Sequence, residues 1–262
     1  MSEWRGRSLG TNTVSYDDTQ PILYALAVGA RASDLDLVFE ERLRVLPTFA
    51  LTLAQWAPDA LGSAGAFDIT TAVHGSQRLR VRKPLPRSGS VEMSAHVAEV
   101  WDKGSAAVFE VAVESPYFEA TWSLFAPGAG GFGGDRGPSS RRRPETEPDG
   151  SLTVATSPRQ AALYRLLGDR HHLHIDPEAA QKAGMPRPIL HGLCTLVAVT
   201  LPLAESLGAH PADLLELEGR FTAPVFPGDA LHLETWKEDE TTLAEASVNG
   251  KTVITAARAR FA

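Results

Sequence analysis

One pattern occurs twice in this chain and constrains its fold more than any other feature. Residues 83–89 read KPLPRSG, and apolar residues then alternate with polar ones over 91–97. Residues 223–229 read APVFPGD, and a similar alternation follows over 231–235. Alternation with a period of two is typical of a half-buried strand. The repeat therefore predicts two similar halves in one chain with a cleft between them; the alternative is a chance recurrence of proline–glycine corners.

Each half also contains an apolar stretch of helical length ahead of its strands, at residues 47–56 and 189–204. Further strands are predicted at 106–113 and 252–261. Each of these strands follows a turn signal, Lys103-Gly104 or Asn249-Gly250. We therefore expect each half to be a helix followed by an antiparallel sheet that wraps it, which is an α+β architecture.

A glycine- and proline-rich stretch separates the two halves. Residues 126–150 contain almost no large apolar side chain other than Phe132, which we expect to pin the loop to a domain. The predicted organisation is an N-terminal domain over 1–125, a linker over 126–155 and a C-terminal domain over 156–262. The run Arg141-Arg142-Arg143 suits an anionic partner, but acidic residues follow it directly and favour a solvated linker.

Composition excludes several classes of function. The formal net charge of −7 opposes nucleic-acid binding, which needs a positive field. Cys194 is the single cysteine, so an intramolecular disulfide is impossible and a reducing compartment is indicated. The sequence has no apolar run long enough to span a membrane and does not begin like a signal peptide. We expect a soluble cytoplasmic protein with no membrane or nucleic-acid partner.

The stretch 164–195 carries the candidate chemistry. Asp176-Pro177-Glu178 is a strong helix start and Gly184 a good stop, so a short helix is predicted over 177–183. Asp169 and His174 precede that helix in a loop, and Gly192 opens the next, apolar helix.

A carboxylate and an imidazole so close in sequence can together position one water and transfer one proton. The free N–H groups at the start of a glycine-led helix can stabilise an oxyanion. These are the parts for chemistry next to an activated carbonyl carbon. The competing interpretation is that Asp169 caps a turn and His174 is a packed core histidine.

The stretch 164–195, YRLLGDRHHLHIDPEAAQKAGMPRPILHGLCT, resembles the signature of the R-specific 2-enoyl-CoA hydratases, the MaoC-like group of hotdog-fold proteins. The resemblance extends over most of the chain and is to the two-domain form found in peroxisomal multifunctional enzymes. The other segments that carry it are YALAVGA at 24–30, VLPTF at 45–49, VHGSQ at 73–77, GAGGFGGDRGP at 128–138 and FTAPVFPGD at 221–229. It implies a double hotdog with the catalytic residues in the C-terminal half.

By this resemblance Asp169 and His174 match the catalytic pair of the family, and Gly192 the glycine whose N–H receives the thioester oxygen. The reaction implied is addition of water to a trans-2-enoyl-CoA to give the 3R-hydroxyacyl-CoA, without a metal or redox cofactor. The partners implied are an acyl-CoA thioester, an acyl carrier protein as a further possibility, and a second copy of the chain in a homodimer. Residues implied to bind substrate are His171, His191, Leu193, His74, Gly75 and Gln77.

Position 171 departs from the family, because the asparagine of its motif is here His171. A histidine is larger than asparagine and can carry charge near neutral pH. It either replaces asparagine as a hydrogen-bond donor or displaces the water. Together with His172 and His174 it also suits a metal site, but adjacent histidines rarely aim at one ion, and we predict no metal.

Several residues have two interpretations. Cys194 is a thiol nucleophile or a buried small apolar residue, and its place in an apolar helix favours burial. His74, Gly75 and Gln77 contact the ligand or form a turn between strands. Arg187 and Arg220 bind CoA phosphates or have structural roles.

Two other functions compete with CoA-dependent hydration. The first is dehydration of 3-hydroxyacyl chains on a carrier protein, which uses the same chemistry on a phosphopantetheine thioester. The second is non-catalytic binding of acyl-CoA, which the loss of asparagine at position 171 would permit. A thioesterase is a weaker alternative, because the resemblance is to the hydratase segment.

Overall fold

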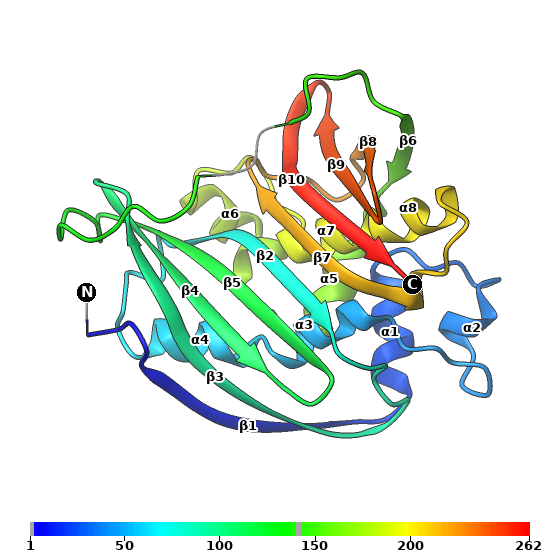
Figure 1. Ribbon diagram of the computed structural model, residues 1–262, viewed down its shortest axis with the longest axis horizontal. Coiled ribbons are helices and arrows are strands. Elements are labelled where there is room, and N and C mark those ends of the chain that lie inside the picture. Colours follow the sequence, from blue (N-terminus) through cyan, green and yellow to red (C-terminus); the bar gives the residue numbers. More distant parts are fainter. Residues whose placement is uncertain (1–2, 140–142) are drawn as a thin grey trace.

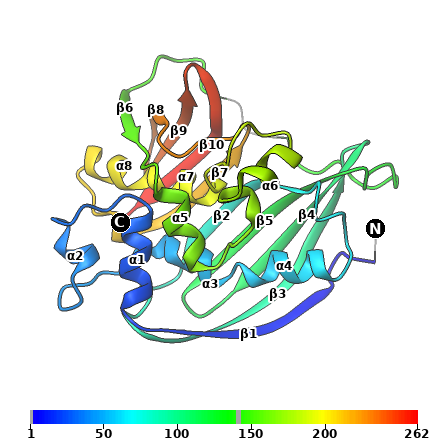
Figure 2. The same ribbon diagram turned by 180° about the vertical axis from the view of Figure 1, so that it is seen from behind.

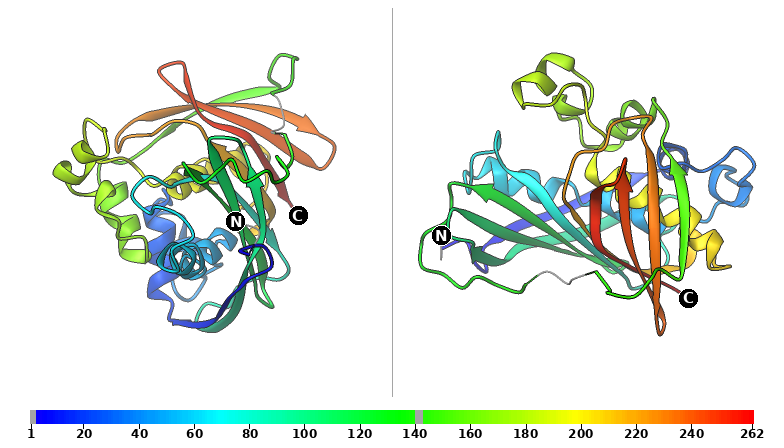
Figure 3. Two further views of the ribbon diagram at one scale, coloured as in Figure 1. Left: turned by 90° about the vertical axis from the view of Figure 1, so that its left-hand side faces the viewer. Right: turned by 90° about the horizontal axis from the view of Figure 1, so that it is seen from above.

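The computed structural model describes residues 3–139 and 143–262, so Arg141 and Arg142 of the arginine run lie outside the described residues. Its strands form one antiparallel sheet of ten, in the order β1-β3-β4-β5-β2-β7-β10-β9-β8-β6 (Figure 1). The first five neighbours belong to the N-terminal half and the last five to the C-terminal half. Helices lie on one face of the sheet, and the sheet curves around them (Figures 2 and 3).

The strands are β1 (Ser8–Tyr16), β2 (Val73–Val81), β3 (Gly89–Asp102), β4 (Ala106–Glu114), β5 (Phe118–Pro127), β6 (Gly150–Ala155), β7 (Leu214–Phe221), β8 (Ala230–Glu238), β9 (Thr241–Val248) and β10 (Lys251–Phe261). The α-helices are α1 (Thr19–Ala27), α2 (Leu35–Val38), α3 (Ala50–Leu53), α4 (Trp56–Ser63), α5 (Gln160–Tyr164), α6 (Pro177–Lys182), α7 (Gly192–Ala198) and α8 (Thr200–Ser206). The 3-10 helices are η1 (Pro47–Phe49), η2 (Arg165–Leu167), η3 (His172–His174) and η4 (Pro211–Asp213).

The two half-sheets are joined edge to edge by the antiparallel pairing of β2 with β7. Gln77 lies opposite Gly219 near the middle of this pairing, and Leu79 lies opposite Leu217. The α+β class is confirmed, with the two predicted sheets continuous as one. No helix among the described residues is long and apolar enough to cross a membrane.

Most predicted elements are present, with shifted ends. The strands expected at 106–113 and 252–261 are β4 and β10, and Asn249 and Gly250 form the tight turn before β10 with positive φ angles of 50° and 77°. The two helices differ from the prediction. The first is divided into η1, α3 and α4 and continues to Ser63, and the second begins at Gly192 and is divided between α7 and α8.

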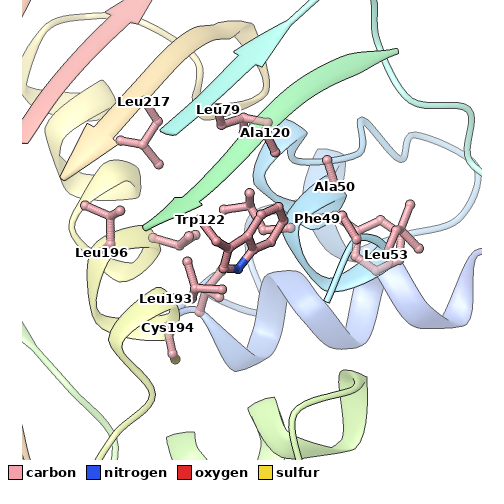
Figure 4. Close-up of a cluster of buried hydrophobic side chains, with 14 of the residues drawn as sticks. Phe49, Ala50, Leu53, Leu79, Ala120, Trp122, Leu193, Cys194, Leu196 and Leu217 are labelled. Atoms are coloured by element: carbon pink, nitrogen blue, oxygen red, sulfur yellow. The ribbon is translucent and has the colours of Figure 1, made fainter. Parts of the chain in front are cut away.

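Helices and sheet share one apolar core that crosses between the halves (Figure 4). Phe49 beside α3 and Trp122 of β5 come from the first half, and Leu193 and Leu196 of α7 come from the second. Trp122 is 1% exposed and Leu196 is fully buried. Because burial of such side chains stabilises by about 1.5–3 kcal/mol each, the two halves depend on each other for stability.

One carboxylate accepts several backbone hydrogen bonds from the glycine-rich segment after β5. Asp102 accepts hydrogen bonds from the backbone N–H groups of Gly104, Gly131, Gly133 and Gly134, at 2.7 to 3.3 Å. Those bonds lower the pKa of Asp102 to about 2.

The glycine-rich segment contains one large apolar side chain, Phe132, and the predicted linker ends in a strand. Phe132 packs against the core, as its position in the sequence predicts. The predicted linker over 126–155 includes β6 at its C-terminal end, where Ser151 and Leu152 pair with Glu234 and Leu233 of β8.

We predict that Asp102→Ala releases the glycine-rich segment, because four backbone donors lose their acceptor. The melting temperature should fall, and trypsin should cleave after Arg136 faster than in the unmodified protein. Since the folded pKa of Asp102 is depressed, its stabilisation is present above the usual aspartate pKa of about 3.9 and is lost as the pH falls toward 2. Asp135→Ala is the matched control, because among residues 3–139 and 143–262 the hydrogen bond that the Asp135 side chain accepts is from the Gly137 N–H. Equal cleavage rates in the two variants would contradict the prediction.

Candidate active site

A cavity of about 730 Å³ lies where the two halves meet. His74 of β2 and Trp122 of β5 line it from the N-terminal half. The loop 168–174 and the start of α7 line it from the C-terminal half. The cavity corresponds to the cleft that the sequence repeat predicts, and it brings Asp169, His174 and Gly192 to one place.

Hydrogen bonds within the loop hold its side chains in position. The His171 N–H donates to Asp169 Oδ1 at 3.1 Å, and the Leu173 N–H donates to His171 Nδ1 at 3.2 Å. These bonds close the turn that leads into η3. Asp176 then caps α6 by accepting from the Glu178 N–H at 2.9 Å, as its Asp-Pro-Glu sequence predicts. The turn is therefore set by side chains local to it.

The geometry around His174 determines which of its nitrogens faces the cavity as an acceptor. Nδ1 lies 2.9 Å from the carbonyl oxygen of Ile189, which can only accept, so Nδ1 carries the proton. Nε2 is then the unprotonated nitrogen of the neutral ring, 3.9 Å from Asp169 Oδ2. Burial lowers the pKa of His174, which favours the neutral ring near pH 7.

Two acceptors at this separation suit a shared water. A water that donates hydrogen bonds of about 2.8 Å to two acceptors holds them roughly 4–5 Å apart. The Nε2 to Oδ2 distance of 3.9 Å is close to this range and too long for a direct hydrogen bond. A water bound in this way directs its oxygen lone pairs away from both groups, into the space that a substrate would occupy.

His191 supports this pair from behind and is itself almost fully buried, at 2% exposure. Its ring stacks on His174 with centroids 3.6 Å apart, and its Nε2–H donates to the backbone carbonyl of Asp169 at 3.1 Å. Burial, followed by the proximity of His174, lowers the pKa of His191 to about 3. His191 thus stays neutral and joins the start of α7 to the Asp169 loop, where it contacts His174 and the backbone of Asp169.

The side chains of Asp169, His174 and His191 approach one another as closely as metal ligands do. The two imidazoles, however, are nearly parallel, with an interplanar angle of 24°. The nitrogen lone pairs of stacked rings lie in two nearly parallel planes, here with ring centroids 3.6 Å apart, so they do not converge well on one ion. The arrangement therefore fits water better than a metal.

Gly192 is the first residue of α7, where backbone N–H groups have no partner within the helix. A Cβ atom at this position would lie 3.2 Å from the ring of Phe221, which lines the same cavity. The absence of a side chain therefore lets the Phe221 ring pack directly against the start of α7, and both residues line the cavity together with Asp169 and His174.

The remaining residues predicted to bind substrate are divided. His171, Leu193 and His74 line the cavity together with His191. Gly75 and Gln77 also lie on β2 but are not among the residues that line the cavity. Gln77 is 1% exposed, in the strand pairing that joins the halves.

Sequence reasoning missed several residues that complete the cavity. Trp122, Leu124, Phe221 and Val225 supply apolar surface, and Asp59 of α4 adds a carboxylate. The alternation of apolar residues along β5 could have identified the first two as facing inward, but Asp59 sits in a short helix with no motif around it.

Packing resolves the two interpretations of Cys194 but not those of Arg187 and Arg220. Cys194 is fully buried and its Sγ lies 3.7 Å from the Ala27 carbonyl; burial raises the pKa of the thiol, so it is not a nucleophile. Arg187 bonds to the Pro227 carbonyl and Asp229 and lies over the ring of Phe226, and Arg220 lies opposite Ser76 in the β2–β7 ladder. Both arginines remain exposed, so binding of CoA phosphates by them stays a prediction.

The fold and the site define a two-domain protein of hotdog architecture with an Asp–His pair at the seam of its halves. Residues 14–125 match the MFE-2 hydratase 2 N-terminal domain, and residues 139–258 match the MaoC like domain. The chain belongs to the MaoC-like hydratase family in its two-domain form, which confirms both the resemblance and the double-hotdog fold.

Relatives agree with this assignment along nearly the whole chain. The chain is 39% identical over 252 residues to peroxisomal multifunctional enzyme type 2 of Mus musculus, covering 89% of this chain and 34% of that enzyme. It is 37% identical over 256 residues to enoyl-CoA hydratase ChsH3 of Mycobacterium tuberculosis, covering 91% and 90%. The crystal structure of a MaoC-like dehydratase from Phytophthora capsici superposes with a TM-score of 0.88 at 26% identity, covering 99% and 96%. The chain spans about a third of the mouse enzyme.

The buried neutral state of His191 predicts a pH-dependent stability. Its folded pKa of about 3 lies below the usual value of about 6.5, so below pH 6.5 the unfolded chain binds the extra proton and stability falls. The contribution to the slope is at most about 1.4 kcal/mol per pH unit, between about pH 6.5 and 3. The free energy of unfolding, measured with urea at several pH values across this range, should change less steeply with pH for His191→Asn than for the unmodified protein. His232→Asn, at an exposed strand position, is the control; parallel curves for all three proteins would refute the prediction.

Proposed function

We propose that this protein catalyses the reversible, R-specific addition of water to trans-2-enoyl-CoA. The observation that carries the proposal is the pair of acceptors, Asp169 Oδ2 and neutral His174 Nε2, 3.9 Å apart in a cavity between the halves. Family membership supports it, and so does the relative named enoyl-CoA hydratase ChsH3, of which this chain covers 90%.

In the hydration direction, Asp169 and His174 each accept one hydrogen bond from the same water. The water oxygen attacks C3 of the enoyl group, and a proton passes from the water to the pair. Burial keeps His174 neutral at rest, so it is ready to accept that proton. C2 then receives a proton from the same pair, which returns both groups to their starting state and completes the addition of one water.

Charge develops on the thioester oxygen as C3 is attacked. The N–H of Gly192, at the positive end of α7, is placed to stabilise this oxygen. Gly192 and Phe221 both line the cavity, so the thioester would reach this helix end from the cavity side. No step of this route requires a cofactor, because the substrate supplies the electron sink.

The proposal includes the carrier of the acyl chain, the oligomeric state and the cellular compartment. The substrate is CoA-bound, with carrier-protein thioesters as the alternative carrier. The molecule acts as a homodimer in the cytoplasm, and the single buried free cysteine suits that compartment. Comparing turnover of CoA and carrier-protein thioesters, and measuring mass in solution, tests the carrier and the dimer.

Incubation with a trans-2-enoyl-CoA should lower the absorbance of the enoyl thioester. The product should be oxidised by a 3R-specific hydroxyacyl-CoA dehydrogenase and not by a 3S-specific one. Asp169→Asn and His174→Gln should each lower kcat by about 10²–10⁴-fold, as expected for general acid–base groups. The double variant should be little worse than either, because the pair acts on one water. His172→Gln, an exposed neighbour outside the cavity, is the control.

A 3S product, or near-normal turnover in either single variant, would contradict this assignment. Binding of an enoyl-CoA analogue without any turnover would instead indicate an acyl-CoA-binding protein. Release of free CoA thiol at the same rate as loss of substrate would indicate a thioesterase.

Position 171 generates a separate prediction. His171 Nδ1 accepts from the Leu173 N–H and so helps to hold the turn beside Asp169. An asparagine oxygen can accept the same bond, whereas alanine cannot. The kcat/KM for one trans-2-enoyl-CoA should therefore be kept or raised in His171→Asn and lowered in His171→Ala. Equal values in all three proteins would mean that His171 takes no part; activity that appears only in His171→Asn would favour the binding-only function.

A further inference from the structure

Asp169, Arg170, His174 and His191 make one part of the cavity polar. Elsewhere Trp122, Leu124, Leu193, Val225 and Ile254 supply apolar surface. A second polar surface, which we call the polar wall, is formed by Gln55 and Asp59 of the N-terminal half and by His171 of the loop 168–174. A carboxylate beside an acyl-binding surface is unexpected, because an apolar chain laid against it would remove its water without replacing the lost hydrogen bonds.

Asp59 is not engaged by a strong partner. Within residues 3–139 and 143–262, its side chain accepts one hydrogen bond, from Gln55 Nε2 at the long distance of 3.4 Å. The carboxylate also lies close enough to Asp169 to be repelled and to His171 to be attracted. Burial and then the Asp169 charge raise the pKa of Asp59, so the surroundings oppose its charge more than they stabilise it.

His171 offers the complementary group. Its Nδ1 accepts from the Leu173 N–H, so the proton of the neutral ring resides on Nε2. None of the hydrogen bonds among the described residues uses this Nε2 as donor. Asp59 and His171 thus line one cavity from opposite halves of the chain, and both are exposed to solvent there. Asp59 offers a hydrogen-bond acceptor and His171 a donor.

A hydroxyl group is the small substituent that satisfies both sides, since it donates one hydrogen bond and accepts others. An ammonium group would donate to Asp59 but could not accept from His171, and a methyl group would do neither. We propose that Asp59 and His171 form a subsite for a hydroxyl group on the acyl chain, and that the enzyme prefers hydroxylated enoyl-CoA thioesters over their deoxy counterparts. This specificity rests on the hydratase function proposed above.

The test compares matched pairs of trans-2-enoyl-CoA that differ by one hydroxyl, with the hydroxyl moved stepwise along the chain from C4 outward. At the position that reaches the polar wall, the unmodified protein should show a kcat/KM for the hydroxylated member roughly 10-fold or more above the deoxy member. This is the size expected for a hydrogen bond to a charged group. At other positions the hydroxyl should lower kcat/KM.

Asp59→Leu should reverse the preference at that one position. Asp59→Asn keeps the size and a weaker acceptor, so its ratio should fall between the two. Glu92→Leu, which removes an exposed carboxylate from β3, controls for loss of negative charge. Asp59 lies in the first turn of α4, so thermal unfolding of each variant verifies that the helix survives.

A deoxy preference at every position, or an unchanged ratio in Asp59→Leu, would overturn the subsite while leaving the hydratase function intact. If no enoyl-CoA is turned over, the hydratase proposal fails. The subsite is then decided by calorimetry with saturated hydroxylated and deoxy acyl-CoA pairs. Equal dissociation constants for the two members in the unmodified protein would refute it.

Discussion

The pairing of β2 with β7 is the constraint on which the site depends. It joins two half-sheets along one edge, and the helices of both halves then pack on the same face of one continuous sheet. Gly219 of β7 is needed at this seam, because a Cβ atom there would lie 2.6 Å from Leu196 of α7. The close approach of α7 to the seam places His191 and Gly192 beside the cavity. A loosened seam would therefore displace the catalytic loop as well as the core.

Within the site, desolvation has the largest effect on the charge state of the histidines. His74, His174 and His191 all have pKa values lowered by burial as the leading cause, even though the Asp169 charge opposes the shift in each case. Their backbone hydrogen bonds then assign the tautomers. His174 and His74 donate to the carbonyls of Ile189 and Ser76, and His191 donates to that of Asp169. Neutral rings with defined acceptor nitrogens follow from packing, with no strong ion pair at the catalytic carboxylate.

The elements that sequence reasoning predicted well are those with local signals. The Asp176 cap of α6, the Asn249-Gly250 turn and the alternating strands β4 and β10 each depend on a few neighbouring residues. Strand β9 was not predicted because its first four residues are all buried, which removes the alternation that marks a strand. The hydrogen bonds that Asp102 accepts from the glycine-rich segment were also missed. Their donors are backbone groups about thirty residues further along the chain.

The site shows the same division between local and distant signals. Asp169, His174 and Gly192 lie within one stretch and were recognisable together, whereas Asp59 comes from a helix of the other half and becomes part of the site only through the fold. The break between α3 and α4 matters here, since the predicted single helix ended at Trp56 and left Asp59 outside it. The two halves have therefore diverged in role. In the proposed mechanism the C-terminal half supplies the groups that act on water, and the N-terminal half contributes Asp59 to the surface that an acyl chain would contact.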